Sequence, residues 1–135
     1  TMTADSAHLL ARVRDICLSF PGAQEKTSHG SPVFYTTKTF CWWAGHVHRD
    51  DRARGVPDDA LAQAITFLPS PDERDALLAD GRFLVPAYLG TRGWLAYDLS
   101  GRLGGPVDWS EVHELIDSSY RATAGKRLIA QLDAR

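Results

Sequence analysis

The sequence has few cysteines and no long apolar run. Its two cysteines, Cys17 and Cys41, stand inside apolar stretches, where a free thiol behaves as a small hydrophobic side chain. Two such residues do not make the disulfide framework of a small secreted protein, so we expect a cytoplasmic protein. No apolar segment reaches the roughly 18 to 20 residues of a membrane-spanning helix, and the N-terminus lacks the basic and hydrophobic regions of a signal peptide, so no membrane association is expected.

The chain also lacks an excess of charge of either sign. Fifteen lysines and arginines face seventeen aspartates and glutamates, for a formal net charge of -2. A chain with this balance has no long-range attraction to a phosphate backbone, so nucleic-acid binding would need a local basic patch. With 44% hydrophobic residues the chain is expected to fold. No repeat, low-complexity tract or linker divides it, and we expect one domain over residues 1–135.

Signature motifs of catalysis are absent. The sequence contains neither a dinucleotide-binding fingerprint nor a Walker-type phosphate loop, and its serines do not form a nucleophile elbow. Both cysteines lie in apolar periodic segments, where burial makes a thiol unreactive. The sequence therefore predicts a non-enzymatic protein with no catalytic residue and no cofactor.

Four segments have the hydrophobic spacing or the capping residues of helices. An amphipathic helix is expected over about 5–20, before a Pro-Gly pair that would end it. The Ser-Pro-Asp-Glu sequence from Ser70 predicts the start of a second helix, which stops at Gly81. An Asp-x-x-Glu capping box begins a helix over about 108–124, and a short helix follows Gly125.

Five segments rich in β-branched and aromatic residues are expected to be strands. The first two are separated only by Lys38, which predicts a hairpin. Residues 40–44 are apolar on both faces, so the second strand should be central and covered on both sides. Of the adjacent Trp42 and Trp43, at least one must face away from the other. The five predicted strands are 33–37, 39–47, 64–68, 83–85 and 94–99.

The predicted order is helix, three strands, helix, two strands, helix. Short links between the strands favour antiparallel pairing over βαβ crossovers. The expected fold class is therefore α+β, with two layers in which an antiparallel sheet is backed by the first and last amphipathic helices. Residues 48–59 are polar without periodicity and are expected to form a loop.

Basic residues that suit phosphate binding gather in this polar segment. Arg49, Arg52 and Arg54 lie there, and Arg92 is presented by the Gly-Thr-Arg-Gly turn between the last two strands. Four aspartates in the same polar segment offset part of the charge. Proteins that depend on phosphate contacts commonly make about six to ten of them. The four arginines therefore predict at most weak contacts with a nucleic-acid backbone, and the alternative is a solvated loop.

Histidines suggest two further hypotheses. His46 and His48 would lie on one face of a strand end, but they specify only two ligands, so the sequence predicts no metal site. The second hypothesis is a small-molecule pocket or an unrecognised enzyme around His29, Tyr88 and Arg92, which we favour less than nucleic-acid binding or protein interaction.

Four segments together resemble one protein family. As a set they are similar to the MmcQ/YjbR family over nearly the whole chain, apart from about 49–59. The resemblance implies a two-layer α+β fold with an antiparallel sheet, likened both to a double-wing nucleic-acid-binding domain and to secretion-chaperone-like folds. It also implies DNA binding, and it brings no catalytic residues. The segments are CLSFPGAQEKTSHGSPVF from Cys17, the K-x-F from Lys38, RFLVPAYLGTRGWLAYDL from Arg82 and VDWSEVHELIDSSYRATAGKRL from Val107.

Two functions are therefore expected. The first is a cytoplasmic, non-enzymatic domain that binds DNA or another nucleic acid weakly, with the four arginines named above on backbone phosphates. The alternative is a homodimeric protein-interaction or chaperone-like module without nucleic-acid binding. Its contact would include Trp42 or Trp43 and the segment 48–59.

Overall fold

The computed structural model describes residues 4–135, and the predicted domain also includes residues 1–3, which lie outside the described part. The predicted α+β class and the antiparallel sheet are confirmed. In chain order the elements are α1 (Ala4–Leu18), β1 (Gln24–Ser28), β2 (Ser31–Tyr35), β3 (Thr39–Trp43), α2 (Arg49–Ala53), β4 (Ala64–Phe67), α3 (Pro71–Asp80), β5 (Phe83–Leu84), the 3₁₀ helix η1 (Leu89–Arg92), β6 (Leu95–Asp98), α4 (Trp109–Thr123) and α5 (Lys126–Asp133).

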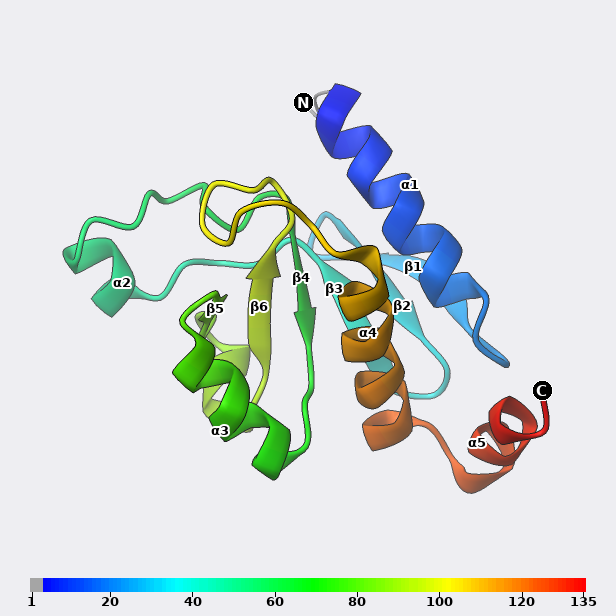
Figure 1. The fold of residues 1–135 in the computed structure, drawn as a ribbon. Helices are drawn as coiled ribbons and strands as arrows, with labels where there is room; N and C mark the ends of the chain where they lie inside the picture. The colour runs from blue at the N-terminus through cyan, green and yellow to red at the C-terminus, as the bar shows by residue number, and fades with distance from the viewer. Residues whose placement is uncertain (1–3) are drawn as a thin grey trace.

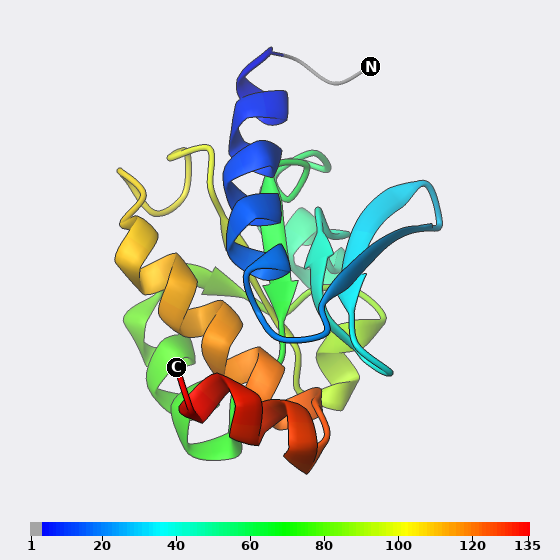
Figure 2. The same ribbon diagram turned by 90° about the vertical axis from the view of Figure 1, so that its right-hand side faces the viewer.

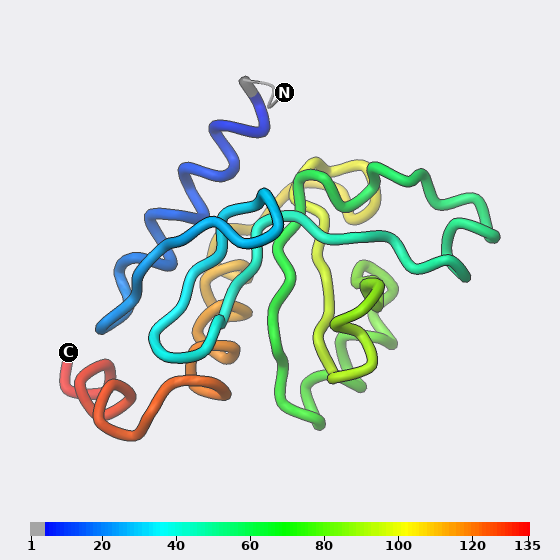
Figure 3. Tube along the Cα trace, turned by 180° about the vertical axis from the view of Figure 1, so that it is seen from behind, coloured from blue at the N-terminus to red at the C-terminus, as the bar shows by residue number. Residues whose placement is uncertain are grey.

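One sheet organises the molecule, with strand order β1-β2-β3-β4-β6-β5 and every neighbouring pair antiparallel. Helices α1, α3 and α4 lie on one face of this sheet (Figure 1). The short helix η1 lies on the opposite face, as the two other views show (Figures 2 and 3). None of the helices within residues 4–135 has the length and apolar character needed to cross a bilayer.

The main core lies between the sheet and the helices α1 and α4. Phe20, Phe40 and Tyr120 form a buried aromatic cluster there, with ring centroids 4.9 to 6.1 Å apart. The Tyr120 hydroxyl donates a hydrogen bond of 2.6 Å to the Pro21 carbonyl, which ties α4 to the end of α1. The Asp108 side chain accepts from the backbone amides of residues 110 and 111, so the predicted cap of α4 is confirmed.

The strand β3 separates its two tryptophans, as predicted. Trp43 is 4% exposed and belongs to the main core. Trp42 pairs with Thr66 of β4, and Thr66 pairs with Ala96 of β6. Because directly opposed residues of neighbouring strands share one face, these three lie on the face opposite the main core. The prediction that this strand is central is confirmed.

A second, smaller core covers part of that opposite face. Leu61 is fully buried there, beside Val47 and Ala96. The loop between α2 and β4 therefore returns over the sheet, so that both faces carry apolar contacts.

Four sequence-based predictions were wrong in detail, three of them in the strands and the polar loop. The sheet has six strands rather than five, because the polar sequence of β1 forms an exposed edge strand that carries no apolar alternation. The strand β3 ends at Trp43 rather than at residue 47, since Ala44 takes a positive φ of 67°. Within the predicted loop 48–59, residues Arg49–Ala53 form the helix α2, which His48 caps by accepting from the Asp50 amide at 3.1 Å.

The Gly-Thr-Arg-Gly segment forms η1 rather than a simple turn. This compact shape depends on Gly90, since a Cβ there would lie 2.4 Å from the Val85 Cγ1. A larger residue would push η1 away from the segment that follows β5.

Candidate functional site

The structure separates the four predicted arginines into three locations. Arg49 and Arg52 lie on α2 and line one cavity of about 540 Å³. Arg54, at the end of α2, lines a different cavity of about 440 Å³, together with apolar residues of the β5 region. Arg92 is exposed at the end of η1 and lines neither cavity. Only Arg49 and Arg52 therefore share a concave surface.

Two of these arginines are already paired with carboxylates. The Arg52 Nη1 lies 3.8 Å from an Asp58 carboxylate oxygen, and Arg54 pairs with Asp51. Arg49 makes no ion pair within the described part of the chain. Neighbouring aspartates therefore offset the charges of Arg52 and Arg54, as predicted.

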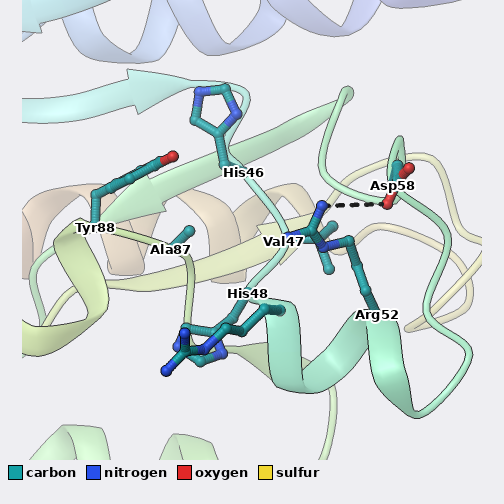
Figure 4. A pocket seen from close by; sticks show the side chains of 8 residues that line it. His46, Val47, His48, Arg52, Asp58, Ala87 and Tyr88 are labelled. Carbon is teal, nitrogen blue, oxygen red and sulfur yellow. Dashed lines mark ion pairs between the residues drawn. The ribbon is translucent and has the colours of Figure 1, made fainter.

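The cavity beside α2 carries more basic than acidic groups, and we name it the basic cavity. His46 and Tyr88 lie at one side of it and the ion pair of Arg52 with Asp58 lies at the other (Figure 4). Asp58 is its one carboxylate among the described residues. The lining residues are His46, Val47, His48, Arg49, Arg52, Asp58, Ala87 and Tyr88.

A second cavity of about 480 Å³ adjoins the first, and we name it the aromatic groove. It is lined by Ser28, His29, Ser31, residues 42–46, Thr66 and residues 86–89, without a carboxylate among the described residues. The two cavities share three lining residues, His46, Ala87 and Tyr88. They therefore form one continuous surface on the sheet face opposite the main core.

Long-range backbone contacts hold the walls of this groove together. The Ala87 amide donates to the His46 carbonyl at 2.8 Å, and the Ala44 amide donates to the Ala64 carbonyl at 2.7 Å. Thr66 donates its hydroxyl to the Ala44 carbonyl at 3.1 Å. A Cβ at Gly45 would lie 2.9 Å from the Thr66 hydroxyl oxygen, so a glycine allows this close approach.

Strained backbone conformations gather in the aromatic groove. Among residues 4–135, the non-glycine residues with positive φ are His29 (50°), Ala44 (67°) and Tyr88 (66°), and all three line it. Such conformations cost about 1 to 3 kcal/mol each and persist where surrounding structure imposes them, often at functional sites. Their shared location marks this groove as a candidate site.

Tyr88 combines the most strained backbone of these residues with an exposed side chain. Its ψ is −65°, and the Leu89 amide donates to the Ala87 carbonyl at 2.7 Å, so Tyr88 is the centre of a classic γ-turn. The side chain is 81% exposed. Its ring meets the His46 ring edge-on, with centroids 5.8 Å apart. The turn therefore holds an aromatic ring in solvent at the junction of the two cavities.

A buried donor without a partner also belongs to the aromatic groove. The Trp42 Nε1 is buried and makes no hydrogen bond within the described residues. An indole N–H can only donate, and an unpaired buried donor costs about 1 to 3 kcal/mol. An acceptor atom on a bound molecule would satisfy it.

Sequence reasoning had found part of this site. Of the three residues in the small-molecule hypothesis, His29 and Tyr88 line the aromatic groove, and Arg92 does not. His46 and His48 both line the basic cavity, and the described residues contain no group of three or more side chains suited to a metal ion. The sequence did not predict which of the two tryptophans would line a cavity. It indicated only that the adjacent Trp42 and Trp43 face in different directions.

Comparison with known proteins covers the part of the chain that forms both cavities. The sequence model of the YjbR family matches residues 18–122, a range that contains all lining residues of both cavities. No curated protein matches the chain. The resemblance found in the sequence motifs is thus confirmed by a match over most of the chain, and the protein belongs to the YjbR family.

Proposed function

We propose that this chain is a non-enzymatic domain that binds single-stranded nucleic acid along the basic cavity and the aromatic groove. The observation that carries the proposal is the continuity of the two cavities through His46, Ala87 and Tyr88. Arginines line one end of this surface and exposed or half-buried aromatic rings line the other. Proteins that bind single strands commonly combine a positive groove for the backbone with aromatic side chains for the bases.

Local charge supports a polyanionic ligand despite the net charge of the chain. Two arginines line the combined surface, against the one carboxylate among its described residues, that of Asp58. A local excess of positive charge attracts phosphates over short range, even where the whole molecule is weakly acidic. The acidic residues that set the net charge lie mostly elsewhere on the molecule.

The small number of arginines favours a single strand over a duplex. Proteins that rely on phosphate contacts commonly make about six to ten of them, whereas only Arg49 and Arg52 share this surface, and Arg52 is paired. Base stacking on an aromatic ring contributes about 1 to 3 kcal/mol per base in single-strand binding. Tyr88 has the exposure that such stacking needs.

The test is fluorescence anisotropy of a labelled eight-nucleotide dT strand and of a duplex of equal length at low salt. We expect the single strand to bind more tightly, with an affinity that falls as salt rises. The double variant Arg49→Glu and Arg52→Glu should bind about tenfold more weakly and with a shallower salt dependence. The control is Arg127→Glu on α5, which lies far from α2 (Figure 1) and should leave binding unchanged. Absence of binding at low salt would refute the proposal.

A homodimeric interaction module is the second candidate, and the exposure of Tyr88 favours it. An aromatic side chain that is 81% exposed suits a contact with another protein surface. Light scattering distinguishes the two functions. A dimer that Tyr88→Ala converts to a monomer, without any nucleic-acid binding, would support the second candidate and contradict the first. In either case we propose a cytoplasmic location, where the two free thiols stay reduced.

A further inference from the structure

We propose that the aromatic groove is a pocket for one unstacked base of the bound strand, in which the Trp42 Nε1 donates a hydrogen bond to the base. This inference rests on the proposed function and names the chemical group that the groove takes. It assigns the basic cavity to the backbone and the aromatic groove to the base.

The unpaired indole nitrogen is the first argument. Four buried side-chain polar atoms lack a partner within the described residues, and among their owners only Trp42 lines the aromatic groove. A planar base carries ring nitrogens and carbonyl oxygens that accept hydrogen bonds on its edge. A base edge therefore offers the acceptor that this buried donor lacks.

The second argument is the chemistry of the rest of the lining. The groove contains the rings of Trp42, His29, His46 and Tyr88 and the hydroxyl groups of Ser28 and Ser31, without a carboxylate among the described residues. Aromatic faces stack on bases, and hydroxyl groups donate to or accept from base edges. A free phosphate or an acidic peptide would use few of these groups.

The third argument is the position of Tyr88 between the two cavities. Its strained turn fixes the ring where the groove meets the basic cavity. A base that enters the aromatic groove leaves its phosphate on the side of Arg49 and Arg52. The shared residues thus lie where the sugar joins base to backbone, which matches the connectivity of a nucleotide.

The experiment is a double-mutant cycle between the protein and the ligand. The two ligands are labelled eight-nucleotide dT and a strand of the same length and charge in which every base is absent. The wild-type protein should bind dT about tenfold more tightly than the abasic strand, in the range of one stacked and hydrogen-bonded base. In Trp42→Phe this preference should shrink several-fold, while affinity for the abasic strand stays unchanged.

The control is Trp109→Phe, which changes a tryptophan on α4 that lies under the Arg12 guanidinium instead of in the groove. It should bind both strands as the wild-type protein does. Equal binding of dT and the abasic strand, weakened in both cases by Arg49→Glu, would overturn the base pocket and leave the proposed function intact. Loss of both ligands in Trp42→Phe would also overturn the pocket, because it would indicate a structural role.

A free nucleotide shares the chemistry of a base in a strand, so a competition arm distinguishes these sources. Thymidine monophosphate should displace the labelled strand only at much higher concentration than unlabelled dT, because it lacks the neighbouring phosphates. Displacement at equal concentration would keep the base pocket and overturn the strand as its ligand. Failure of every ligand to bind would refute the proposed function and this inference together.

Discussion

The positive φ at Tyr88 predicts backbone strain, and comparing the stabilities of two variants at this position tests it directly. We compare Tyr88→Gly with Tyr88→Ala. Both variants remove the same exposed ring and its edge contact with His46, so those losses cancel between them. They differ in the Cβ, which is unfavourable at the φ of 66° that this position adopts.

The expected difference follows from two opposing contributions. Relief of a strained conformation stabilises the glycine variant by about 1 to 3 kcal/mol. The greater freedom of glycine in the unfolded chain costs about 0.5 to 1 kcal/mol. Tyr88→Gly should therefore be more stable than Tyr88→Ala by about 1 kcal/mol.

Urea unfolding measures this difference. With a slope of about 1 to 3 kcal/mol per molar urea, the midpoint of Tyr88→Gly should exceed that of Tyr88→Ala by about 0.3 to 1 M. Both variants should lose affinity for the single strand equally, because both lack the ring. A glycine variant less stable than the alanine variant would refute the strain and, with it, one argument for the aromatic groove.

Three further predictions concern the scaffold around the site. Ser119→Ala should lower the free energy of unfolding by about 2 to 4 kcal/mol in urea, because its hydroxyl accepts from a part-buried backbone amide after β4 and donates to a buried carbonyl in β3. The Arg82 guanidinium lowers the pKa of Asp80, so stability should decline as pH falls below about 4, and less steeply in Asp80→Asn. Burial raises the pKa of the Cys17 thiol, so this thiol should react with a thiol reagent only after denaturant is added.

The elements that the sequence predicted well are those with local signals. The cap of α4 at Asp108 needs only residues within one helical turn, and α3 lies between its two caps, Ser70 and Gly81, for equally local reasons. The hairpin around Lys38 was likewise visible in the β-branched and aromatic residues on either side. Each of these predictions is confirmed.

The missed elements have weak local signals. The strand β1 is a polar edge strand, held by its pairing with β2 rather than by an apolar face. The helix α2 buries no residue, so it shows no hydrophobic period, and its cap is a histidine rather than the commoner serine, threonine, aspartate or asparagine. Such elements depend on their tertiary surroundings.

The candidate site was only partly accessible from the sequence for the same reason. The residues of α2 and the isolated Tyr88 could be proposed from their chemistry. Their arrangement depends on the contact between the segments 42–46 and 86–89, which the Ala87 amide and the His46 carbonyl join. No short-range pattern reports a contact of that separation, so the aromatic groove becomes visible only in the fold.

The most direct test of the account is an NMR titration of ¹⁵N-labelled protein with unlabelled eight-nucleotide dT. The chain has four tryptophans and therefore only four indole N–H signals. The signal that is missing from the spectrum of Trp42→Phe belongs to Trp42. We expect the Trp42 indole signal to shift on binding, together with backbone amides of residues 42–49 and 87–90. An unmoved Trp42 indole, with shifts confined to α5 or the β1 edge, would contradict the account.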